Sequence, residues 1–197
     1  MKNAKNVHII GIGGIGTSAV ARYFVTKGAE VSGSDMHPSS IIDDLSKEDV
    51  RVKIGHFADN IPRECDLVVY SRAVPATNVE RQAAVERGIT EVSYPQFIGA
   101  LAKEYKTIAI SGTNGKSTTT AMVARILIDA GLDPTVIIGT LVPGWEKKNL
   151  RVGKGDWLIV EACEHLASML EISPDIAVIT NIEEDHLDFY KDLDDIR

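Results

Sequence analysis

The sequence predicts an α/β protein made of two successive units, each an open parallel sheet with helices on its faces. Short apolar runs alternate with segments of helical periodicity along the 197 residues, and this alternation is typical of parallel sheets. Two of the runs, at 7–10 and 107–110, lead directly into a glycine-rich turn and then a helical segment. In open parallel sheets such turns lie at the carboxyl ends of strands, where ligands bind.

The first hundred residues contain the first unit. Gly28 and Gly88 are expected to end two of its helices, because glycine readily adopts the left-handed conformation that follows many helix ends. The predicted elements follow in the order strand 7–10, helix 15–26, strand 30–35, helix 41–45, strand 51–54, strand 66–71, helix 78–87 and strand 91–93.

The second unit follows a linking helix predicted at 97–104, and we place the boundary between the units after residue 102, giving units 1–102 and 103–197. Its elements are predicted in the order strand 107–110, helix 116–130 with Gly131 at its end, strand 135–138, loop 143–149, strand 157–160 and strand 176–180. Residues 194–197 show no closing strand and no capped helix, so the second unit is expected to be incomplete.

The composition limits the possible partners. Acidic residues outnumber basic ones by 28 to 21, and the net charge of -7 argues against a nucleic-acid or anionic-membrane surface. No apolar run is long enough to span a bilayer and no signal-peptide pattern is present, so a cytoplasmic protein is expected. Cys65 and Cys163 have no metal-type spacing and are expected to be reduced thiols.

The first glycine-rich turn has the spacing of a dinucleotide-binding loop. Gly13, Gly14 and Gly16 would allow a tight turn and a close approach of the backbone to a pyrophosphate. Asp35 ends the second strand roughly 20 residues further on, where an acidic side chain often bonds a ribose hydroxyl. The pattern leaves open a nicotinamide cofactor, another nucleotide, or a turn that serves packing alone.

The second turn resembles a shortened phosphate-binding loop of the P-loop type. The usual pattern is G-x-x-x-x-G-K-[ST], but Ile110 stands where its first glycine would be. The loop would still place backbone N–H groups, the Lys116 ammonium and a hydroxyl for magnesium around the phosphates. A Ser/Thr-rich helix cap is the alternative. The predicted ATP-binding residues are Gly112, Thr113, Asn114, Gly115, Lys116, Ser117 and Thr118.

Two further strand ends carry groups that could bind a metal ion. Glu161 follows the apolar run 157–160 and could ligate magnesium directly or through water. His186 follows the last predicted strand and could position a second metal or a phosphate. Solvated loop charge is expected for Glu183, Glu184 and Asp188. Of the other histidines, structural positions are expected for His8 and His37, while His56 and His165 stay open.

Taken in order, these motifs resemble those of the Mur ligases of peptidoglycan synthesis, over the whole length of the chain. The resemblance implies a Rossmann-like first domain, followed by a P-loop NTPase-like α/β domain that is incomplete here. The motifs are Gly11-Ile-Gly-Gly-Ile-Gly16, Gly33-Ser34-Asp35, Gly112-Thr-Asn-Gly-Lys-Ser-Thr-Thr119, Glu161-Ala-Cys-Glu164 and Thr180-Asn-Ile-Glu-Glu-Asp-His-Leu-Asp188.

The resemblance implies that the first unit binds the UDP part of a substrate rather than a nicotinamide. Gly13, Gly14 and Gly16 would approach the diphosphate. Ser34 and Asp35 match the uridine region, and Ser71 matches a neighbouring strand end. In the second unit the implied catalytic residues are Lys116, Glu161 and His186, and the implied metal ligands are Ser117, Glu161 and His186.

Within the family, the motifs are most similar to those of the member that joins L-alanine to UDP-N-acetylmuramate with ATP and Mg²⁺ through an acyl phosphate. Two positions depart from the usual pattern, since Cys163 replaces an aspartate and Asn114 replaces a common histidine. The family's C-terminal amino-acid-binding domain has no counterpart here, so this chain alone is expected not to ligate.

Three other functions remain as hypotheses. A related recycling ligase joins a whole tripeptide to the same UDP sugar. A non-catalytic UDP-sugar-binding module would use the first unit alone. A nicotinamide-linked oxidoreductase is indicated only by the first glycine-rich turn.

Overall fold

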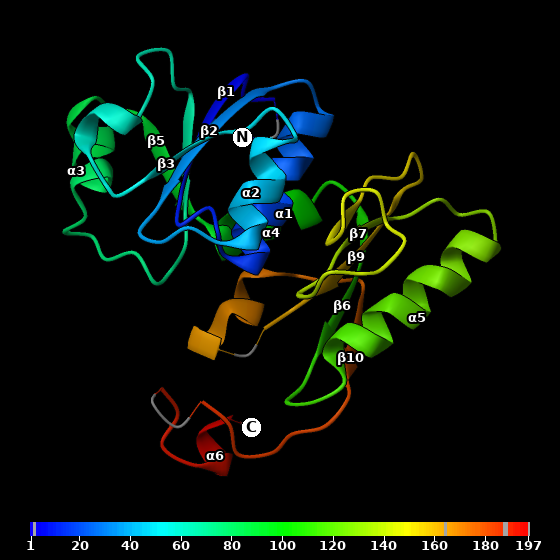
Figure 1. Ribbon diagram of the computed structural model, residues 1–197. Helices are drawn as coiled ribbons and strands as arrows, with labels where there is room; N and C mark the ends of the chain where they lie inside the picture. The colour runs from blue at the N-terminus through cyan, green and yellow to red at the C-terminus, as the bar shows by residue number, and fades with distance from the viewer. Residues whose placement is uncertain (2, 164, 187–188, 197) are drawn as a thin grey trace. The chain divides into compact units, whose positions relative to one another are not determined.

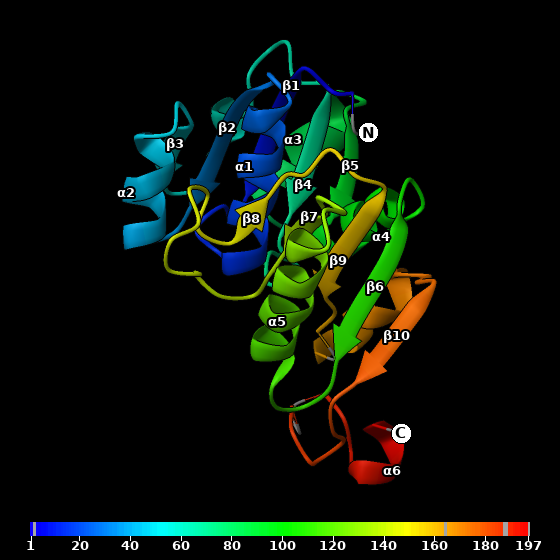
Figure 2. The same cartoon turned by 90° about the vertical axis from the view of Figure 1, so that its right-hand side faces the viewer.

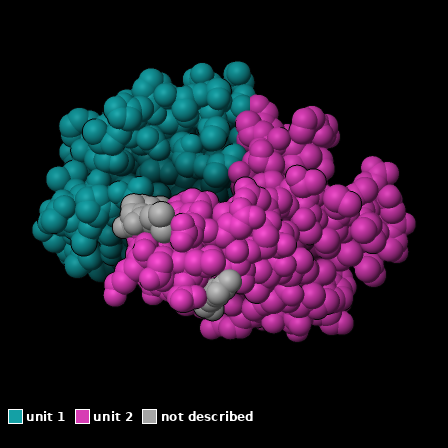
Figure 3. Space-filling view, turned by 90° about the horizontal axis from the view of Figure 1, so that it is seen from below, with its two compact units in different colours: residues 1–97 teal, residues 98–197 magenta. Residues whose placement is uncertain are grey.

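The computed structural model describes the chain except residues 2, 164, 187–188 and 197. It divides into two compact units, Met1–Phe97 and Ile98–Arg197, coloured separately in Figure 3. The division falls inside one helix, α4 (Tyr94–Ala102). Each unit contains its own five-stranded sheet, so the predicted α/β class is confirmed.

The sheet of the first unit is parallel throughout, with strand order β3-β2-β1-β4-β5 (Figure 1). This is the order of a dinucleotide-binding fold, in which the direction of winding reverses between β1 and β4. Its strands are β1 (Asn6–Ile10), β2 (Glu30–Asp35), β3 (Arg51–Ile54), β4 (Leu67–Tyr70) and β5 (Thr90–Ser93).

Helices cover both faces of this sheet. Right-handed crossovers place α1 (Ile15–Thr26) and α2 (Ser40–Ser46) on one face and α3 (Val79–Glu86) on the other. A short 3-10 helix, η1 (Ala58–Asn60), precedes β4. Buried apolar strand residues such as Ile9 and Val68, both 0% exposed, are typical of parallel sheets, whose two faces are both covered.

The sheet of the second unit has the order β10-β6-β9-β7-β8, and all its pairs are parallel except β7–β8. Helix α5 (Lys116–Asp129) covers one of its faces (Figure 2). Ile110, Ala124 and Ile159 form part of the core between them, all fully buried. The strands are β6 (Lys106–Ser111), β7 (Thr135–Ile137), β8 (Leu150–Arg151), β9 (Trp157–Glu161) and β10 (Ile176–Ile179).

Four details differ from the sequence-based expectation. Helix α4 begins at Tyr94 rather than residue 97, because Ser93 and Gln96 form a reciprocal capping pair: the backbone N–H of each bonds the other's side chain. Strand β8 follows the predicted loop and was missed. So were η1 and a second 3-10 helix, η2 (His165–Glu171). A short helix, α6 (Leu193–Ile196), lies where no capped helix was expected.

None of the helices in the described residues has the length and apolar character needed to cross a bilayer. Cys65 is buried and Cys163 is exposed, and neither of these two described residues is in a disulfide bond.

Candidate functional site

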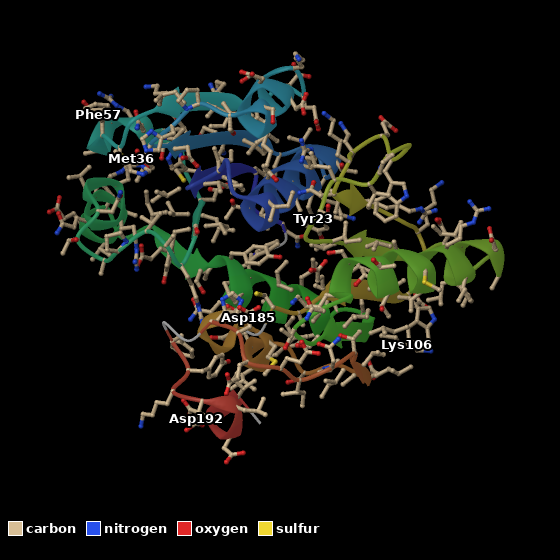
Figure 4. The ribbon with its side chains drawn as sticks, turned by 60° about the horizontal axis from the view of Figure 1, so that its bottom comes forward. Tyr23, Met36, Phe57, Lys106, Asp185 and Asp192 are labelled. Carbon is tan, nitrogen blue, oxygen red and sulfur yellow. The ribbon has the colours of Figure 1, made fainter. Side chains whose placement is uncertain are left out.

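The first unit has a cavity of about 520 Å³ at the carboxyl ends of its central strands. It lies at the point where the chain leaves the neighbouring strands β1 and β4 towards opposite faces of the sheet, the place where open α/β sheets bind ligands. Met36, on its rim, is 55% exposed and is labelled in Figure 4. The lining residues are Gly11, Gly14, Asp35, Met36, His56, Ser71, Ala73, Val74, Pro75, Thr77 and Asn78.

The glycine-rich turn is tied to the end of β2. The backbone N–H of Gly13 donates to Asp35 Oδ2 at 2.9 Å, and a Cβ on Gly13 would come within 2.9 Å of the same oxygen. Gly16 faces the ring of Tyr94, which a Cβ would approach to 2.7 Å. These two glycines therefore allow close packing. Gly14 is the N-cap residue just before α1, and no side chain caps that helix N-terminus.

The structure divides the predicted UDP-binding residues into two groups. Gly14, Asp35 and Ser71 line the cavity. Gly13 and Gly16 instead pack closely against Asp35 and Tyr94. Ser34 is fully buried, and its hydroxyl bonds Glu80 and His56. Ser34 can therefore act on a ligand only through other side chains.

Glu80 was not anticipated from the sequence. Its side chain is fully buried and accepts hydrogen bonds from Ser34 Oγ, Asn60 Nδ2 and the Phe57 N–H. Burial by itself would raise the pKa of Glu80, but hydrogen bonds from His8, Ser34 and Asn60 outweigh burial and lower the pKa to about 2.

Two of the histidines meet Glu80. The Nε2 atom of His8 lies 3.4 Å from Glu80 Oε2, and its Nδ1 lies 2.9 Å from Ser32 Oγ, so this buried side chain occupies a structural position. His56 Nδ1 lies 3.5 Å from Glu80 Oε1, and His56 also lines the cavity. His37 is exposed on the surface.

In the second unit, the phosphate-type loop joins β6 to α5. Gly112 and Gly115 have positive φ angles of 126° and 82°, which favour glycine. The Lys116 ammonium is folded over the loop and donates to Gly112 O at 2.6 Å and to Thr113 O at 3.1 Å. The cation therefore lies against the backbone carbonyls of the loop.

Ser117 and Glu161 lie side by side at the start of α5. Ser117 Oγ is 2.9 and 3.1 Å from the two Glu161 carboxylate oxygens. The Gly139 N–H donates to Glu161 Oε2 at 2.8 Å, and a Cβ on Gly139 would come within 2.8 Å of that carboxylate. Gly139, missed from the sequence, thus orients the carboxylate from the end of β7.

Residues that follow β10 hold the loop from its other side. The Asn181 side-chain amide pairs with the Asn114 peptide: Oδ1 accepts from Asn114 N–H and Nδ2 donates to Asn114 O, both at 2.9 Å. The Thr180 hydroxyl donates to Asn114 O at 2.6 Å. Glu183, expected to be solvated, is exposed but accepts a bond from Asn114 Nδ2 at 3.3 Å. We call this set of bonds the β10 clasp.

The third predicted metal ligand is placed differently. His186 has a positive φ of 50° and its Nε2 lies 3.9 Å from Asp185 Oδ2, a residue labelled in Figure 4. Among the described residues no group of three or more His, Cys, Asp or Glu side chains could hold a metal ion. Of the predicted metal ligands, Ser117 and Glu161 are in contact with each other. Asp188 and the His165 side chain, which also entered the sequence analysis, lie outside the described part of the chain.

The fold and the two loops define a class of protein: two parallel α/β units, each with a glycine-rich strand-to-helix turn. Comparison with known families agrees. Residues 6–106 match the Mur ligase family, catalytic domain, and residues 110–197 match the Mur ligase middle domain. The chain belongs to the Mur ligase family, and the resemblance stated from the motifs is confirmed.

The relatives most similar in sequence among those compared are longer than this chain. The UDP-N-acetylmuramate--L-alanine ligases of Clostridium botulinum (strain Hall) and Lachnoclostridium phytofermentans are 43% and 44% identical to it. Each comparison covers 98% of this chain, but only 42% and 41% of the relative. The chain therefore spans less than half the length of these relatives.

Two solved structures have the same fold. The UDP-N-acetylmuramate-alanine ligase of Thermotoga maritima gives a TM-score of 0.87 at 34% identity, over 98% of this chain and 45% of that one. A UDP-N-acetylmuramate:L-alanyl-gamma-D-glutamyl-meso-diaminopimelate ligase from Neisseria meningitides gives 0.86 at 26% identity, over 98% of this chain and 65% of that one.

Proposed function

We propose that this chain is the part of a peptidoglycan-precursor ligase that binds UDP-N-acetylmuramate and the phosphates of ATP, and that the whole enzyme joins L-alanine to the sugar nucleotide. The observation that carries the proposal is the contact of Ser117 with Glu161 beside Lys116, at the turn between β6 and α5. The names of the relatives above support the choice of substrates. The cavity of the first unit is the proposed site of the UDP group, with Gly14, Asp35 and Ser71 on its wall.

The second unit would hold ATP with magnesium. The Ser117 hydroxyl and the Glu161 carboxylate are hard oxygen donors within 3.1 Å of each other, and such donors suit Mg²⁺. When bound, the ion would neutralise charge on the phosphates. The Gly139 N–H would keep the carboxylate oriented. His186 remains a proposed further ligand, carried by the loop that begins with the β10 clasp.

The proposed chemistry has two steps. The carboxylate of the muramyl group takes the γ-phosphoryl group of ATP, which gives an acyl phosphate and ADP. The amine of L-alanine then attacks the carbonyl carbon, loses a proton, forms the C–N bond and expels phosphate. Lys116 would stabilise the charge that builds up on the phosphoryl oxygens during transfer. The remaining task of the protein is to hold the reacting groups together.

We propose L-alanine rather than a tripeptide as the second substrate because the alanine ligases are more similar to this chain in sequence. Their identity is 34–44%, against 26% for the tripeptide ligase structure. A non-catalytic UDP-sugar-binding module would leave Lys116, Ser117 and Glu161 without a function. The proposed location is the cytoplasm, where ATP is supplied. Because the chain spans about 42% of these relatives, we expect no ligation by this chain alone.

Calorimetric titration tests the substrate. We expect UDP-N-acetylmuramate and UDP to bind, and NADH not to bind. Binding of NADH without UDP would contradict the proposal and favour the oxidoreductase. Turnover of UDP-N-acetylmuramate, L-alanine and ATP by the 197-residue chain would contradict the expected dependence on further residues.

A further inference from the structure

The network around Glu80 determines where the proton of Ser34 lies. Glu80 is ionised at neutral pH, since its pKa is lowered to about 2. An ionised carboxylate only accepts hydrogen bonds. Ser34 Oγ is in contact with Glu80 Oε2, so the single hydroxyl proton of Ser34 must point at Glu80. The opposite orientation would set a hydroxyl lone pair against a buried carboxylate, which is strongly unfavourable.

The position of that proton fixes the tautomer of His56. Ser34 Oγ is also 3.0 Å from His56 Nδ1. Because the only proton of the hydroxyl is used on Glu80, Ser34 can only accept from His56. The Nδ1 atom must therefore carry a proton. In the neutral ring the other nitrogen, Nε2, is then a hydrogen-bond acceptor.

The acceptor nitrogen is available to a ligand. The His56 side chain is 12% exposed and lines the cavity of the first unit. Its Nδ1 is turned towards Ser34 and Glu80, so the ring edge with Nε2 is turned away from them. Within the described residues no protein group bonds Nε2. Asn60 and Phe57 hold Glu80 from the side of η1, which keeps the carboxylate in place beneath the ring.

We propose that His56 is a specificity-determining residue whose Nε2 accepts a hydrogen bond from the imide N–H of a uracil base. Ser34 and Glu80 are positioning residues that hold the ring in the accepting tautomer. The inference rests on the proposed function in taking the ligand to be a uridine nucleotide. Uracil carries a proton on N3, whereas cytosine has a lone pair there, so a fixed acceptor favours the first and repels the second. Ser34, of the Gly33-Ser34-Asp35 motif, would thus affect binding of the base by holding His56 in this tautomer.

The tautomer is measured without a ligand. Long-range ¹⁵N–¹H correlation spectra of the wild-type chain, assigned with His56→Gln, distinguish a protonated from an unprotonated Nδ1. We expect the Nδ1–H form of the neutral ring. An Nε2–H tautomer would overturn the proposal, whatever the chain binds.

Base selectivity is measured by calorimetry with UDP, CDP and 2′-deoxy-UDP. One lost hydrogen bond predicts that CDP binds the wild type about five-fold more weakly than UDP, and that His56→Ala binds both equally. His37→Ala is the matched control, an exposed histidine of the same unit, and should keep the wild-type ratio. The imide assignment would be contradicted if CDP bound more weakly than UDP by the same factor in the wild type and in His56→Ala. It would also be contradicted if the wild type lost affinity for 2′-deoxy-UDP but not for CDP. Failure of every uridine nucleotide to bind would instead count against the proposed function.

The positioning role is tested with Glu80→Gln and Ser34→Ala. The amide of a glutamine at position 80 can donate to Ser34 Oγ, so the Ser34 hydroxyl proton can then point at His56 Nδ1. We therefore expect a mixture of His56 tautomers and a smaller ratio of UDP affinity to CDP affinity. Ser34→Ala removes the link through the hydroxyl and leaves only the 3.5 Å contact between His56 Nδ1 and Glu80 Oε1, so the UDP/CDP ratio should fall, but by less than in Glu80→Gln. Glu86→Gln, an exposed glutamate on the same helix, is the control. A folded Ser34→Ala protein with an unchanged tautomer and ratio would refute the positioning role.

Discussion

Replacing Glu80 with glutamine should remove the part of the first unit's acid sensitivity that comes from the titration of this buried carboxylate. Glu80 is fully buried, and its pKa falls from 4.5 to about 2 in the fold. At about 1.4 kcal/mol per pKa unit, this fall corresponds to about 3 kcal/mol of stability. Because the folded pKa is lowered, that stability is present above the unfolded pKa and is lost as the pH falls through the folded value. The window is therefore about pH 4.5 to 2.

Amide hydrogen exchange followed by mass spectrometry measures the effect in each unit separately. At pH 6 the β1 and β4 peptides of Glu80→Gln should exchange faster than those of wild type. The free energy of opening derived from their exchange should be lower by about 3 kcal/mol. At pH 2.5 most of this difference should be gone. Peptides from β6 and β9 serve as the internal control and should be unchanged. A difference that is constant with pH, or that also appears in β6, would contradict the assignment of this stability to Glu80.

Three further predictions concern the second unit. Lys116→Met should weaken binding of a magnesium–ATP analogue about 10- to 100-fold by calorimetry, since a charge-assisted bond to phosphate is lost, while exposed Lys103→Met should not. Gly112→Ala should destabilise the unit by about 3 kcal/mol in urea unfolding, because the new Cβ would lie 2.3 Å from Thr180 Oγ1 at a φ of 126°; wild-type stability would contradict this. Asn181→Ala should cost about 1–2 kcal/mol and speed exchange of the loop amides, and unchanged exchange would show that the β10 clasp does not hold the loop.

The apolar strands and glycine turns were readable from the sequence because their signals are local. The run Val7-His8-Ile9-Ile10 is followed at once by the glycines of the turn, and Lys116 follows Gly115. In both units the strand, turn and helix occur where the pattern predicts them. The contact of Ser117 with Glu161 also follows from topology, since β6 and β9 are parallel neighbours whose carboxyl ends meet at one edge.

The rest depends on contacts between distant segments. Glu80 lies in the first turn of a helix, where an acidic residue usually interacts with the helix dipole at the surface. Its burial arises only because β1, β2 and η1 bring His8, Ser34 and Asn60 to the same point. The β10 clasp joins residues nearly 70 positions apart, such as Asn114 and Asn181, and no local pattern indicates it.

We propose that one chain binds a UDP sugar in its first unit and magnesium–ATP in its second. Amide hydrogen exchange of the wild-type chain, measured with each ligand in turn, distinguishes the two sites. UDP-N-acetylmuramate should protect peptides containing Gly11–Gly14 and Ser71, and a magnesium–ATP analogue should protect the peptide containing Gly112–Thr118. Protection of the Gly112–Thr118 peptide by the UDP sugar, or of the Gly11–Gly14 peptide by the ATP analogue, would contradict this assignment of the two ligands.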